Sequence, residues 1–500
     1  MTAVTAHPVL SSPSRRRIEQ PPRRPRVVVI GGGFGGVAAA RHLARLPVDL
    51  TLVDRDGTHT VRPLLYQVGV ERQGRADVVR PRAEVLAGPV ADGRLDLVTA
   101  AVTGIDREER LVRLHDGRTL PYDQLVVAAG AAATHLGVPG AADHAVTFTD
   151  ADGADALRAR LAPLLDRRTP PCTVVVVGGG PTGVELAGAV APRAPAAGRR
   201  DLHVELLEAG PHLLAGYAPT ARHSAERTLT QRGVRVRLGD PVAEVEGGMV
   251  RLASGDAVPA ALVLWATGVA VHPVAAVLGL PVVETGPARG RVPVDASLRL
   301  VGHDDVFVIG DLAGAVDRDG RPLPQLAPVA LQQGTHVARE VRRALRGEAP
   351  RPFRFTDKGR LAMVADGVAV ADLPGGIDLP APATWALWLV VHALTMPTPG
   401  AAVDVTRRWI DAATPAVPLG PTARRARRIL RHTARRTAPG RLLVDSLEQR
   451  LPPLPPLAPP APPGASDRAP AADRHAAVTD LVRPPARRRA AGRTRRPTAA

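Results

Sequence analysis

Residues 173–188 read TVVVVGGGPTGVELAG, and an earlier stretch at 27–40 reads VVVIGGGFGGVAAA. In both stretches a β-branched run leads into a glycine cluster and then into small, helix-forming residues. This order predicts a buried strand, a tight turn and a helix whose first N–H groups face a phosphate. The sequence therefore predicts two dinucleotide cradles in one chain.

Both cradles have the spacing G-x-G-x-x-G. The first glycine allows the turn, the second lets a pyrophosphate approach the backbone, and the third lets the helix pack close to the strand. One such motif alone is also compatible with an ordinary glycine turn, whereas two copies in the same local context favour nucleotide binding. The glycines are Gly31, Gly33 and Gly36 in the first cradle and Gly178, Gly180 and Gly183 in the second.

An acidic residue ends the strand that follows each cradle. VDLTLVD ends in Asp54, and LHVELLE ends in Glu208. A carboxylate at this position can accept a hydrogen bond from a ribose hydroxyl. Because Glu208 would repel a 2′-phosphate and no Arg or Lys follows it directly, we expect NADH rather than NADPH at the second cradle. We expect FAD at the first cradle and hydride transfer from nicotinamide to flavin.

Strand-like and helix-like segments alternate from residue 26 to about 345, which predicts the α/β class with parallel sheets. The expected fold has two Rossmann-like dinucleotide-binding domains, a small C-terminal α+β membrane-association region and a disordered basic tail. The expected parts are a basic arm (1–25), the first part of the FAD domain (26–145), the NADH domain (146–284), the second part of the FAD domain (285–345), the membrane-association region (346–410) and a disordered Pro/Arg-rich tail (411–500).

The net charge of +17 lies almost entirely at the two ends of the chain. Residues 411–500 carry +12 and residues 1–25 carry +4, so the body is close to neutral. This distribution argues against nucleic-acid binding by the body. Basic ends of this kind are more often solvated than bound, and the alternative is contact with an anionic surface.

Cys172 is the only cysteine. An internal disulfide and a CxxC redox pair are therefore excluded. We also expect no metal site, because no His/Cys cluster has the spacing of metal ligands. The arginines of SRRRI at 14–18 hint at an export signal, but no apolar segment follows them, so we expect no signal peptide.

Three short stretches resemble the two-dinucleotide-binding-domain flavoproteins, the relatives of the disulfide reductases. They are VAAG at 127–130, WATG at 265–268 and VFVIGDLAG at 306–314. The resemblance implies that Asp311 bonds the ribityl chain of FAD, that Gly130 and Gly310 lie near FAD, and that Gly268 lies near NADH. The missing cysteine pair excludes the disulfide-reductase and sulfide:quinone reductase branches.

Four further stretches resemble the type II NADH:quinone oxidoreductases. They are RPLLYQV at 62–68, GPTGVELAG at 180–188, PQLAPVALQQG at 324–334, and FTDKGRLAMVADG at 355–367 leading into WALWLVVHALT at 385–395. The resemblance covers about 26–411. It implies a peripheral enzyme on the cytoplasmic side of the cell membrane, in which NADH reduces FAD and the reduced flavin passes its electrons to a membrane quinone. A homodimer is a further expectation.

The resemblance also implies roles for two side chains. Glu185 would lie near flavin and nicotinamide and supply a proton; the alternative is a charge that complements the dipole at the start of its helix. The quinone motif of the family is Ala-Gln-x-Ala-x-Gln, in which we expect Gln332 to orient the quinone. The matching residues here are Ala327, Pro328, Ala330 and Gln332, followed by Gln333.

Pro328 replaces the first glutamine of that motif, so the acceptor stays open. One alternative is a soluble NADH-dependent flavoprotein that reduces oxygen, an electron-transfer protein or a small molecule. The other is an NADH sensor whose basic tail binds a partner.

The segment PATWALWLVVHALTMP at 382–397 is too short to span a bilayer, which needs about 20 apolar residues. Its large side chains follow one helical face. Tryptophan and arginine beside an apolar helix are typical of a membrane interface, so we expect 383–410 and the basic tail to bind an anionic lipid surface. The alternative is a buried C-terminal helix. The residues on this face are Trp385, Trp388, Leu389, His392 and Met396.

Overall fold

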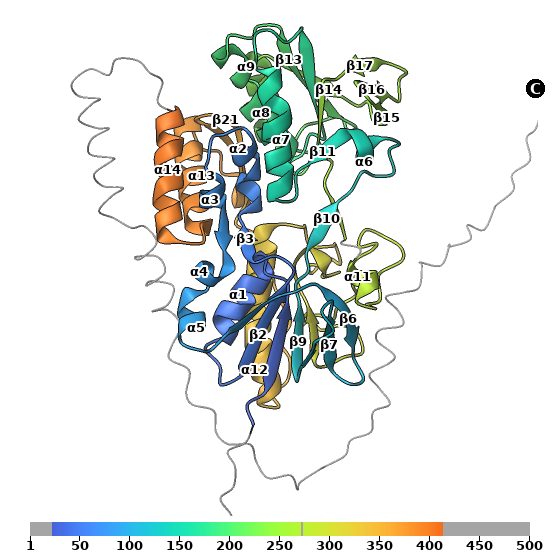
Figure 1. Ribbon diagram of the computed structural model, residues 1–500, viewed down its shortest axis with the longest axis vertical. Coiled ribbons are helices and arrows are strands. Elements are labelled where there is room, and N and C mark those ends of the chain that lie inside the picture. The colour runs from blue at the N-terminus through green and yellow to red at the C-terminus, as the bar shows by residue number, and fades with distance from the viewer. Residues whose placement is uncertain (1–22, 272–273, 414–500) are drawn as a thin grey trace, which may run out of the picture. The chain divides into compact units, whose positions relative to one another are not determined.

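The computed structural model describes residues 23–271 and 274–413 (Figure 1). A first parallel sheet has the strand order β20-β9-β1-β2-β5. Its central strand, RVVVI, is buried because its neighbours cover both edges and its valines fill the core. The strands are β1 (Arg26–Ile30), β2 (Asp49–Asp54), β5 (Asp96–Thr99), β9 (Gln124–Val127) and β20 (Val306–Val308).

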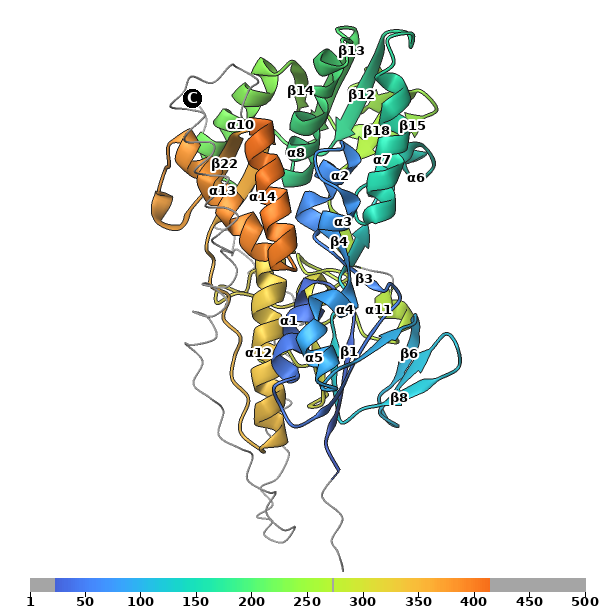
Figure 2. The ribbon, with the colours of Figure 1, turned by 60° about the vertical axis from the view of Figure 1, so that its left-hand side comes forward.

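Two helices pack against each other beside this sheet, α1 (Phe34–Leu43) and α12 (Ala327–Leu345) (Figure 2). Their close approach depends on glycine: a Cβ on Gly334 would lie 2.3 Å from the carbonyl oxygen of Gly35. Gly334, the last residue of the QQG segment, therefore serves helix packing. It joins residues about 300 positions after the first cradle to the helix that begins at that cradle.

The second parallel sheet has the order β11-β18-β12-β13-β14. Helices α7 (Ala151–Leu164), α8 (Pro181–Val190) and α10 (Pro219–Gln231) pack against it. Each parallel sheet is accompanied by a three-stranded antiparallel sheet, so the two halves of the chain repeat one plan. The strands of the second sheet are β11 (Ala145–Thr147), β12 (Cys172–Val177), β13 (Leu202–Glu208), β14 (Val234–Leu238) and β18 (Leu262–Trp265).

Short elements complete the two halves. The antiparallel sheets are β6 (Val102–Asp106), β7 (Leu111–Leu114) and β8 (Thr119–Pro121), and β15 (Val242–Glu246), β16 (Met249–Leu252) and β17 (Ala257–Pro259). Two further antiparallel pairs are β3 (Thr58–Thr60) with β4 (Val79–Pro81), and β10 (Ala131–Ala133) with β19 (Val269–Val271). The short helices are η1 (Arg62–Leu64), α2 (Leu65–Gly69), α3 (Arg75–Val78), α4 (Arg82–Val85), α5 (Ala87–Ala91), α6 (Ala141–His144), α9 (Arg193–Ala196), α11 (Val274–Val277), η2 (Gly310–Leu312) and η3 (Pro374–Gly376).

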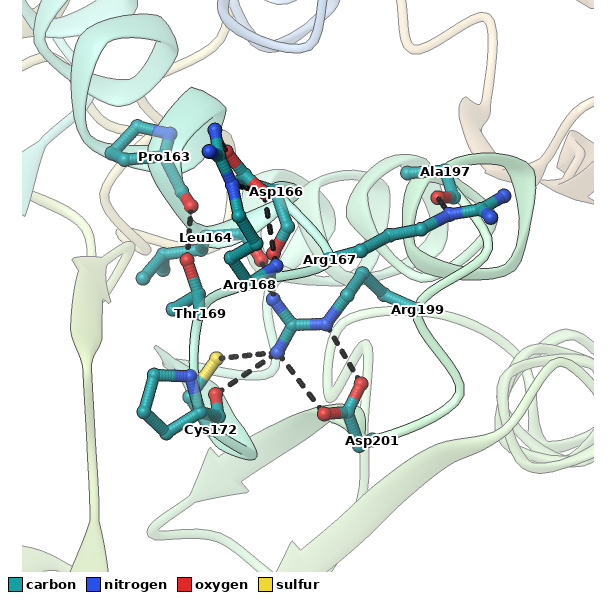
Figure 3. Close-up of polar contacts among 11 residues, drawn as sticks. Pro163, Leu164, Asp166, Arg167, Arg168, Thr169, Cys172, Ala197, Arg199 and Asp201 are labelled. Atoms are coloured by element: carbon teal, nitrogen blue, oxygen red, sulfur yellow. Dashed lines mark hydrogen bonds and ion pairs between the residues drawn. The ribbon is translucent and has the colours of Figure 1, made fainter.

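A buried arginine anchors the entry to the second sheet (Figure 3). Arg199 is 2% exposed, and its guanidinium donates to the carbonyl oxygens of Leu164, Asp166 and Pro170 and to the carboxylate of Asp201. The Sγ atom of Cys172 lies 3.8 Å from the same guanidinium. The single cysteine therefore belongs to a structural cluster that fixes the end of α7 to the start of β12.

The C-terminal part consists of a hairpin and two helices. The hairpin is β21 (Arg360–Ala365) and β22 (Val368–Asp372), and the helices are α13 (Ala381–Thr395) and α14 (Pro399–Ala413). Helix α13 packs against β22 and α14. None of the helices in the described ranges is both long and apolar enough to cross a bilayer.

The helical face of α13 that contains the tryptophans is largely internal, and lipid binding by 383–410 stays a prediction. Trp388 is fully buried, stacks on His392 with a centroid distance of 4.0 Å, and meets the ring of Trp409 edge-on at 4.7 Å. Leu389 and Met396 are also buried. The aromatic face is internal because α14 and the hairpin cover it. The apolar side chains that α13 exposes lie on its other face, at Val390, Val391 and Leu394.

The topology agrees with the predicted α/β class, since β20 from the third predicted part joins the sheet that contains β1. The domain boundaries stay predictions. Most of the basic arm, residues 1–22, and most of the basic tail, residues 414–500, lie outside the described residues.

Candidate functional site

The three glycines of the first cradle have different surroundings, as their predicted roles require. Gly31 has a φ of +99°, a conformation that disfavours any residue with a Cβ. A Cβ on Gly36 would lie 1.8 Å from the carbonyl oxygen of Gly31, so only glycine lets α1 pack this close to β1. A Cβ on Gly33 would have no atom within 4 Å. The space above Gly33, at the N-terminus of α1, fits a pyrophosphate.

The second cradle repeats this geometry. Gly178 has a φ of +106°, and a Cβ on Gly183 would lie 1.8 Å from the carbonyl oxygen of Gly178. Gly180 again has open space. Gly180 precedes α8, whose first turn contains no acidic residue to compete with a phosphate. The residues present therefore fit a dinucleotide at both cradles.

The two strand-end acids are held in the same way. A carboxylate oxygen of Asp54 accepts a hydrogen bond from the backbone N–H of Gly32 at 2.5 Å, and Glu208 accepts from the N–H of Gly179 at the same distance. The second oxygen of Glu208 accepts from the N–H of Gly210 at 2.6 Å. Each acid is thus fixed beside its glycine turn, where the ribose of a dinucleotide is expected.

Arg82 distinguishes the first cradle from the second. Its side chain is buried, and one of its guanidinium nitrogens lies 3.1 Å from a carboxylate oxygen of Asp54. It also donates to the carbonyl oxygens of Asp56 at 2.5 Å and Thr58 at 2.6 Å. Arg82 could not be recognised from the sequence, because a single arginine after a short strand carries no local signal.

The GDLAG turn lies against α12. Gly310 has a φ of +72°, and its N–H donates to the side-chain oxygen of the buried Gln333 at 2.6 Å. The side chain of Gln325 donates to the carbonyl oxygen of Asp311. Burial raises the pKa of the Asp311 carboxyl, while Arg62 and Arg291 act to lower it. Among the described residues, no group of the same turn donates a hydrogen bond to this carboxyl, which leaves its oxygens available to a bound cofactor.

The two strand-to-loop crossings abut the cradles. A Cβ on Gly31 would lie 2.4 Å from the carbonyl oxygen of Ala128, and one on Gly178 would lie 2.6 Å from that of Ala266. Gly130 and Gly268, which end VAAG and WATG, have φ angles of +74° and +113°. The structure therefore brings each crossing next to the cradle for which it was predicted.

Glu185 is buried and is the one acidic residue of α8. A carboxylate oxygen of Glu185 accepts a hydrogen bond from the backbone N–H of Met363 in β21 at 3.2 Å. The close approach of β21 depends on Gly188, where a Cβ would lie 1.7 Å from the carbonyl oxygen of Val364. Burial raises the pKa of the Glu185 carboxyl to about 8, against the opposing effect of the Met363 hydrogen bond. The carboxyl is therefore largely protonated at neutral pH.

This position excludes the helix-dipole alternative for Glu185. The residue lies beyond the first turn of α8, which has no acidic side chain. A neutral carboxyl also gains little from the dipole.

Helix α2, which contains part of the RPLLYQV stretch, packs against α8. The side-chain amide of Gln67 donates to the hydroxyl oxygen of Tyr66 at 2.9 Å and accepts from the indole N–H of Trp409 at 2.6 Å. Burial, and next to it the charge of Glu185, raise the pKa of Tyr66 well above its ordinary value. The stretch therefore contributes a buried polar chain that ends beside Glu185.

The predicted quinone residues fall into three groups. Ala327 and Pro328 form the first turn of α12, where the missing N–H of proline costs no helical hydrogen bond. Ala330 and Gln333 are buried and lie against the GDLAG turn. Gln332 is partly exposed and uses both ends of its amide on the backbone of Thr356, at 2.9 and 3.0 Å.

Fold and site together define a protein of the pyridine nucleotide-disulphide oxidoreductase class. The sequence model of that family matches residues 25–334 of the chain. Among curated proteins, the chain is 32% identical over 412 residues to type II NADH:quinone oxidoreductase Ndh of Mycobacterium tuberculosis, covering 76% of this chain and 86% of that one. It is 30% identical over 401 residues to demethylphylloquinone reductase NdbB of Synechocystis, covering 77% and 96%. The chain belongs to the type II NADH:quinone oxidoreductase family.

A solved structure, NDH2 from Plasmodium falciparum in complex with NADH, matches with a TM-score of 0.69 over 79% of this chain and 99% of that one. At 16% identity this match speaks for the fold alone. The predicted fold class, family, enzyme class and cofactors, FAD and NADH, are confirmed.

Proposed function

We propose that the chain oxidises NADH through FAD and reduces a membrane quinone. The observation that carries this proposal is the position of Glu185, a buried carboxyl on the helix that begins at the second cradle, where burial raises its pKa to about 8. Quinone reduction consumes protons, and the single cysteine lies in a structural cluster, so the chain cannot form an internal disulfide that would accept the electrons.

FAD, when bound, accepts a hydride from NADH and passes two electrons to the acceptor. We propose that Gly31, Gly33 and Gly36 hold its pyrophosphate, with Asp54 at the ribose and Asp311 at the ribityl chain. Gly178, Gly180 and Gly183 hold the pyrophosphate of NADH, with Glu208 at the ribose. The open space at Gly33 and Gly180 supports both assignments. Gly130 and Gly310 flank the first site, and Gly268 flanks the second.

Glu185 is proposed to release its proton to the reduced quinone. A carboxyl with a pKa of about 8 is protonated at pH 7 and still acidic enough to release the proton when charge develops on a quinone oxygen. Gln332 is proposed as a positioning residue on the acceptor side, because its amide holds the backbone of Thr356. Ala327, Pro328, Ala330 and Gln333 would shape the same end of α12.

Membrane binding is proposed to use the exposed apolar face of the C-terminal part. Val390, Val391 and Leu394 are 55%, 38% and 38% exposed on α13, and Ile377 before it is 58% exposed. Exposed aliphatic side chains grouped on one helical face suit the boundary between lipid headgroups and acyl chains. We propose the cytoplasmic face of the cell membrane as the location, an added contribution from the basic tail, and a homodimer.

The proposal is tested with purified protein and lipid vesicles. NADH oxidation is expected to rise strongly on addition of a quinone, and oxygen alone is expected to support only slow turnover. A variant with Val390→Asp and Leu394→Asp should stay in the supernatant when the vesicles are sedimented. Val277→Asp, at an exposed valine of α11, is the matched control and should sediment like the wild type. Fast turnover with oxygen and no response to quinone would favour the soluble-acceptor alternative.

A further inference from the structure

A small cavity lies behind Glu185, on the side where α2, α8, β21 and α14 meet. Its lining includes Tyr66, Gln67, Arg72, Glu185, Asp366 and Trp409. Four elements from distant parts of the sequence therefore line one space, whose wall is mostly apolar but includes the polar side chains named above.

The cavity is large enough for one water molecule. About 20 Å³ of it is open to the centre of a water-sized sphere, and a single water needs roughly 10–15 Å³ by this measure. A buried water also needs two to four polar partners. The cavity lining includes the polar side chains of Tyr66, Gln67, Glu185 and Asp366.

The outer end of the cavity is formed by an ion pair. Arg72 pairs with Asp366, and the two side chains are 24% and 26% exposed. Asp366 lies in the turn between β21 and β22, three residues after Met363, which bonds Glu185. One acid is thus in contact with solvent, the other is buried, and the cavity joins them.

The chemistry of the proposed function requires a route for protons. NADH gives up one hydride, and a quinol carries two added hydrogens, so the balanced reaction is NADH + H⁺ + quinone → NAD⁺ + quinol. One proton per turnover must therefore come from solvent. If it is drawn from the carboxyl of Glu185, an O–H bond breaks there and the resulting carboxylate must be reprotonated before the next turnover.

We infer that this cavity is the proton inlet, in which Asp366 takes a proton from solvent and a single water passes it to Glu185. The inference rests on the proposed function. Asp366 acts only through Glu185, by supplying the proton that reprotonates it. It does not touch the substrate.

The charged groups around the inlet are compatible with this direction of transfer. Burial raises the pKa of Asp366, against the opposing effects of Arg72 and Arg232. Tyr66 on α2 and Tyr217 before α10 both have raised pKa values, so their hydroxyls stay neutral beside Glu185. Arg408 on α14, which also lines the cavity, pairs with Asp77. A proton from solvent therefore reaches the partly exposed carboxyl of Asp366 before the buried carboxyl of Glu185.

The experiment is anaerobic stopped-flow measurement of the two half-reactions of the holoenzyme. Asp366→Asn is expected to slow reoxidation of the flavin by quinone roughly tenfold or more, while flavin reduction by NADH keeps the wild-type rate. Added sodium azide should restore reoxidation, because the small weak acid formed from it, hydrazoic acid, can carry the proton. Asp366→Glu should need no rescue. Asp372→Asn, on the same hairpin but outside the cavity, should behave as wild type.

Arg72→Gln breaks the ion pair between Arg72 and Asp366 but keeps the Asp366 carboxyl. Its reoxidation should not be accelerated by azide, whereas that of Asp366→Asn should be. Wild-type reoxidation in Asp366→Asn, or equal slowing in both variants without rescue, would overturn the inlet. A wild-type protein that quinone does not reoxidise would contradict the proposed function itself, and the inlet would fall with it.

Discussion

A carboxylate oxygen of Glu185 accepts a hydrogen bond from the backbone N–H of Met363, although the two residues are 178 positions apart. The contact joins the helix of the second cradle to the C-terminal hairpin. The same hairpin packs against α13, whose outer face exposes Val390, Val391 and Leu394. The β21–β22 hairpin therefore contacts both the buried Glu185 and the helix that carries the proposed membrane surface.

Glu185→Gln is expected to slow reoxidation of the flavin by quinone by roughly a hundredfold, because glutamine cannot release a proton. Flavin reduction by NADH should change little. In the wild type the pKa of about 8 means that the donor is protonated below that pH, so reoxidation should fall as the pH rises through 8. The reoxidation rate of Glu185→Gln should not show this fall with pH. Measuring both half-reactions between pH 6 and 9 checks the prediction, and a fall that persists in the variant would contradict it.

Gly180→Ala and Gly183→Ala should fail in different ways. Gly180 has a φ of −70° and open space at its Cβ, so alanine is tolerated by the fold but occupies the space proposed for the pyrophosphate. The variant should fold, retain flavin and show a KM for NADH raised by roughly tenfold or more. In Gly183→Ala the new Cβ would lie 1.8 Å from the carbonyl oxygen of Gly178, so α8 must move. Loss of thermal stability in Gly180→Ala as large as in Gly183→Ala would argue against the cradle assignment.

Glu208 is expected to set the preference for NADH. Both of its oxygens accept backbone hydrogen bonds, which fixes the carboxylate beside the glycine turn, where we propose that the ribose binds. Glu208→Gln should narrow the ratio of kcat/KM for NADH over NADPH by roughly tenfold, equal to about 1.4 kcal/mol. Glu244→Gln, an exposed acid in the same half of the chain, is the control. Equal use of both donors by the wild type would show that Glu208 does not discriminate.

Arg199→Ala should lower the midpoint of thermal unfolding by roughly 5 °C or more, because three backbone carbonyl oxygens lose their donor (Figure 3). Arg168 is a matched control, since its side chain is 91% exposed and pairs with Asp166 on the surface. Arg168→Ala should leave the midpoint nearly unchanged. Equal shifts in a thermal scan would mean that the cluster does not anchor the second sheet.

The cradles were predictable because their signal is local. A glycine at +99° or beneath a carbonyl oxygen is required by the turn itself, and it appears in the sequence at fixed spacing. Arg82 was not predictable, because its partner Asp54 lies 28 residues earlier and only the folded strands bring the two together. The contact between Glu185 and Met363 belongs to the same class.

Helix α13 shows a second limit of prediction from sequence, which concerns what covers a helical face. The spacing of Trp388, Leu389 and His392 correctly predicts one face, but it carries no information about what covers that face. Trp409 and the hairpin cover it, so the exposed apolar side chains of α13 lie on the opposite face. Pro328 shows a third limit: as a missing glutamine it suggested an altered acceptor site, whereas its position in the first turn of α12 explains it as a helix start.

The central claim is that reduced flavin in this protein gives its electrons to a quinone. The most direct measurement is anaerobic reduction of the purified flavoprotein with one equivalent of NADH, followed by rapid mixing with a quinone in vesicles or with dissolved oxygen. We predict that quinone restores the oxidised flavin spectrum within the time of one catalytic turnover and that oxygen restores it far more slowly. Reoxidation by oxygen that is as fast as reoxidation by quinone would contradict the account.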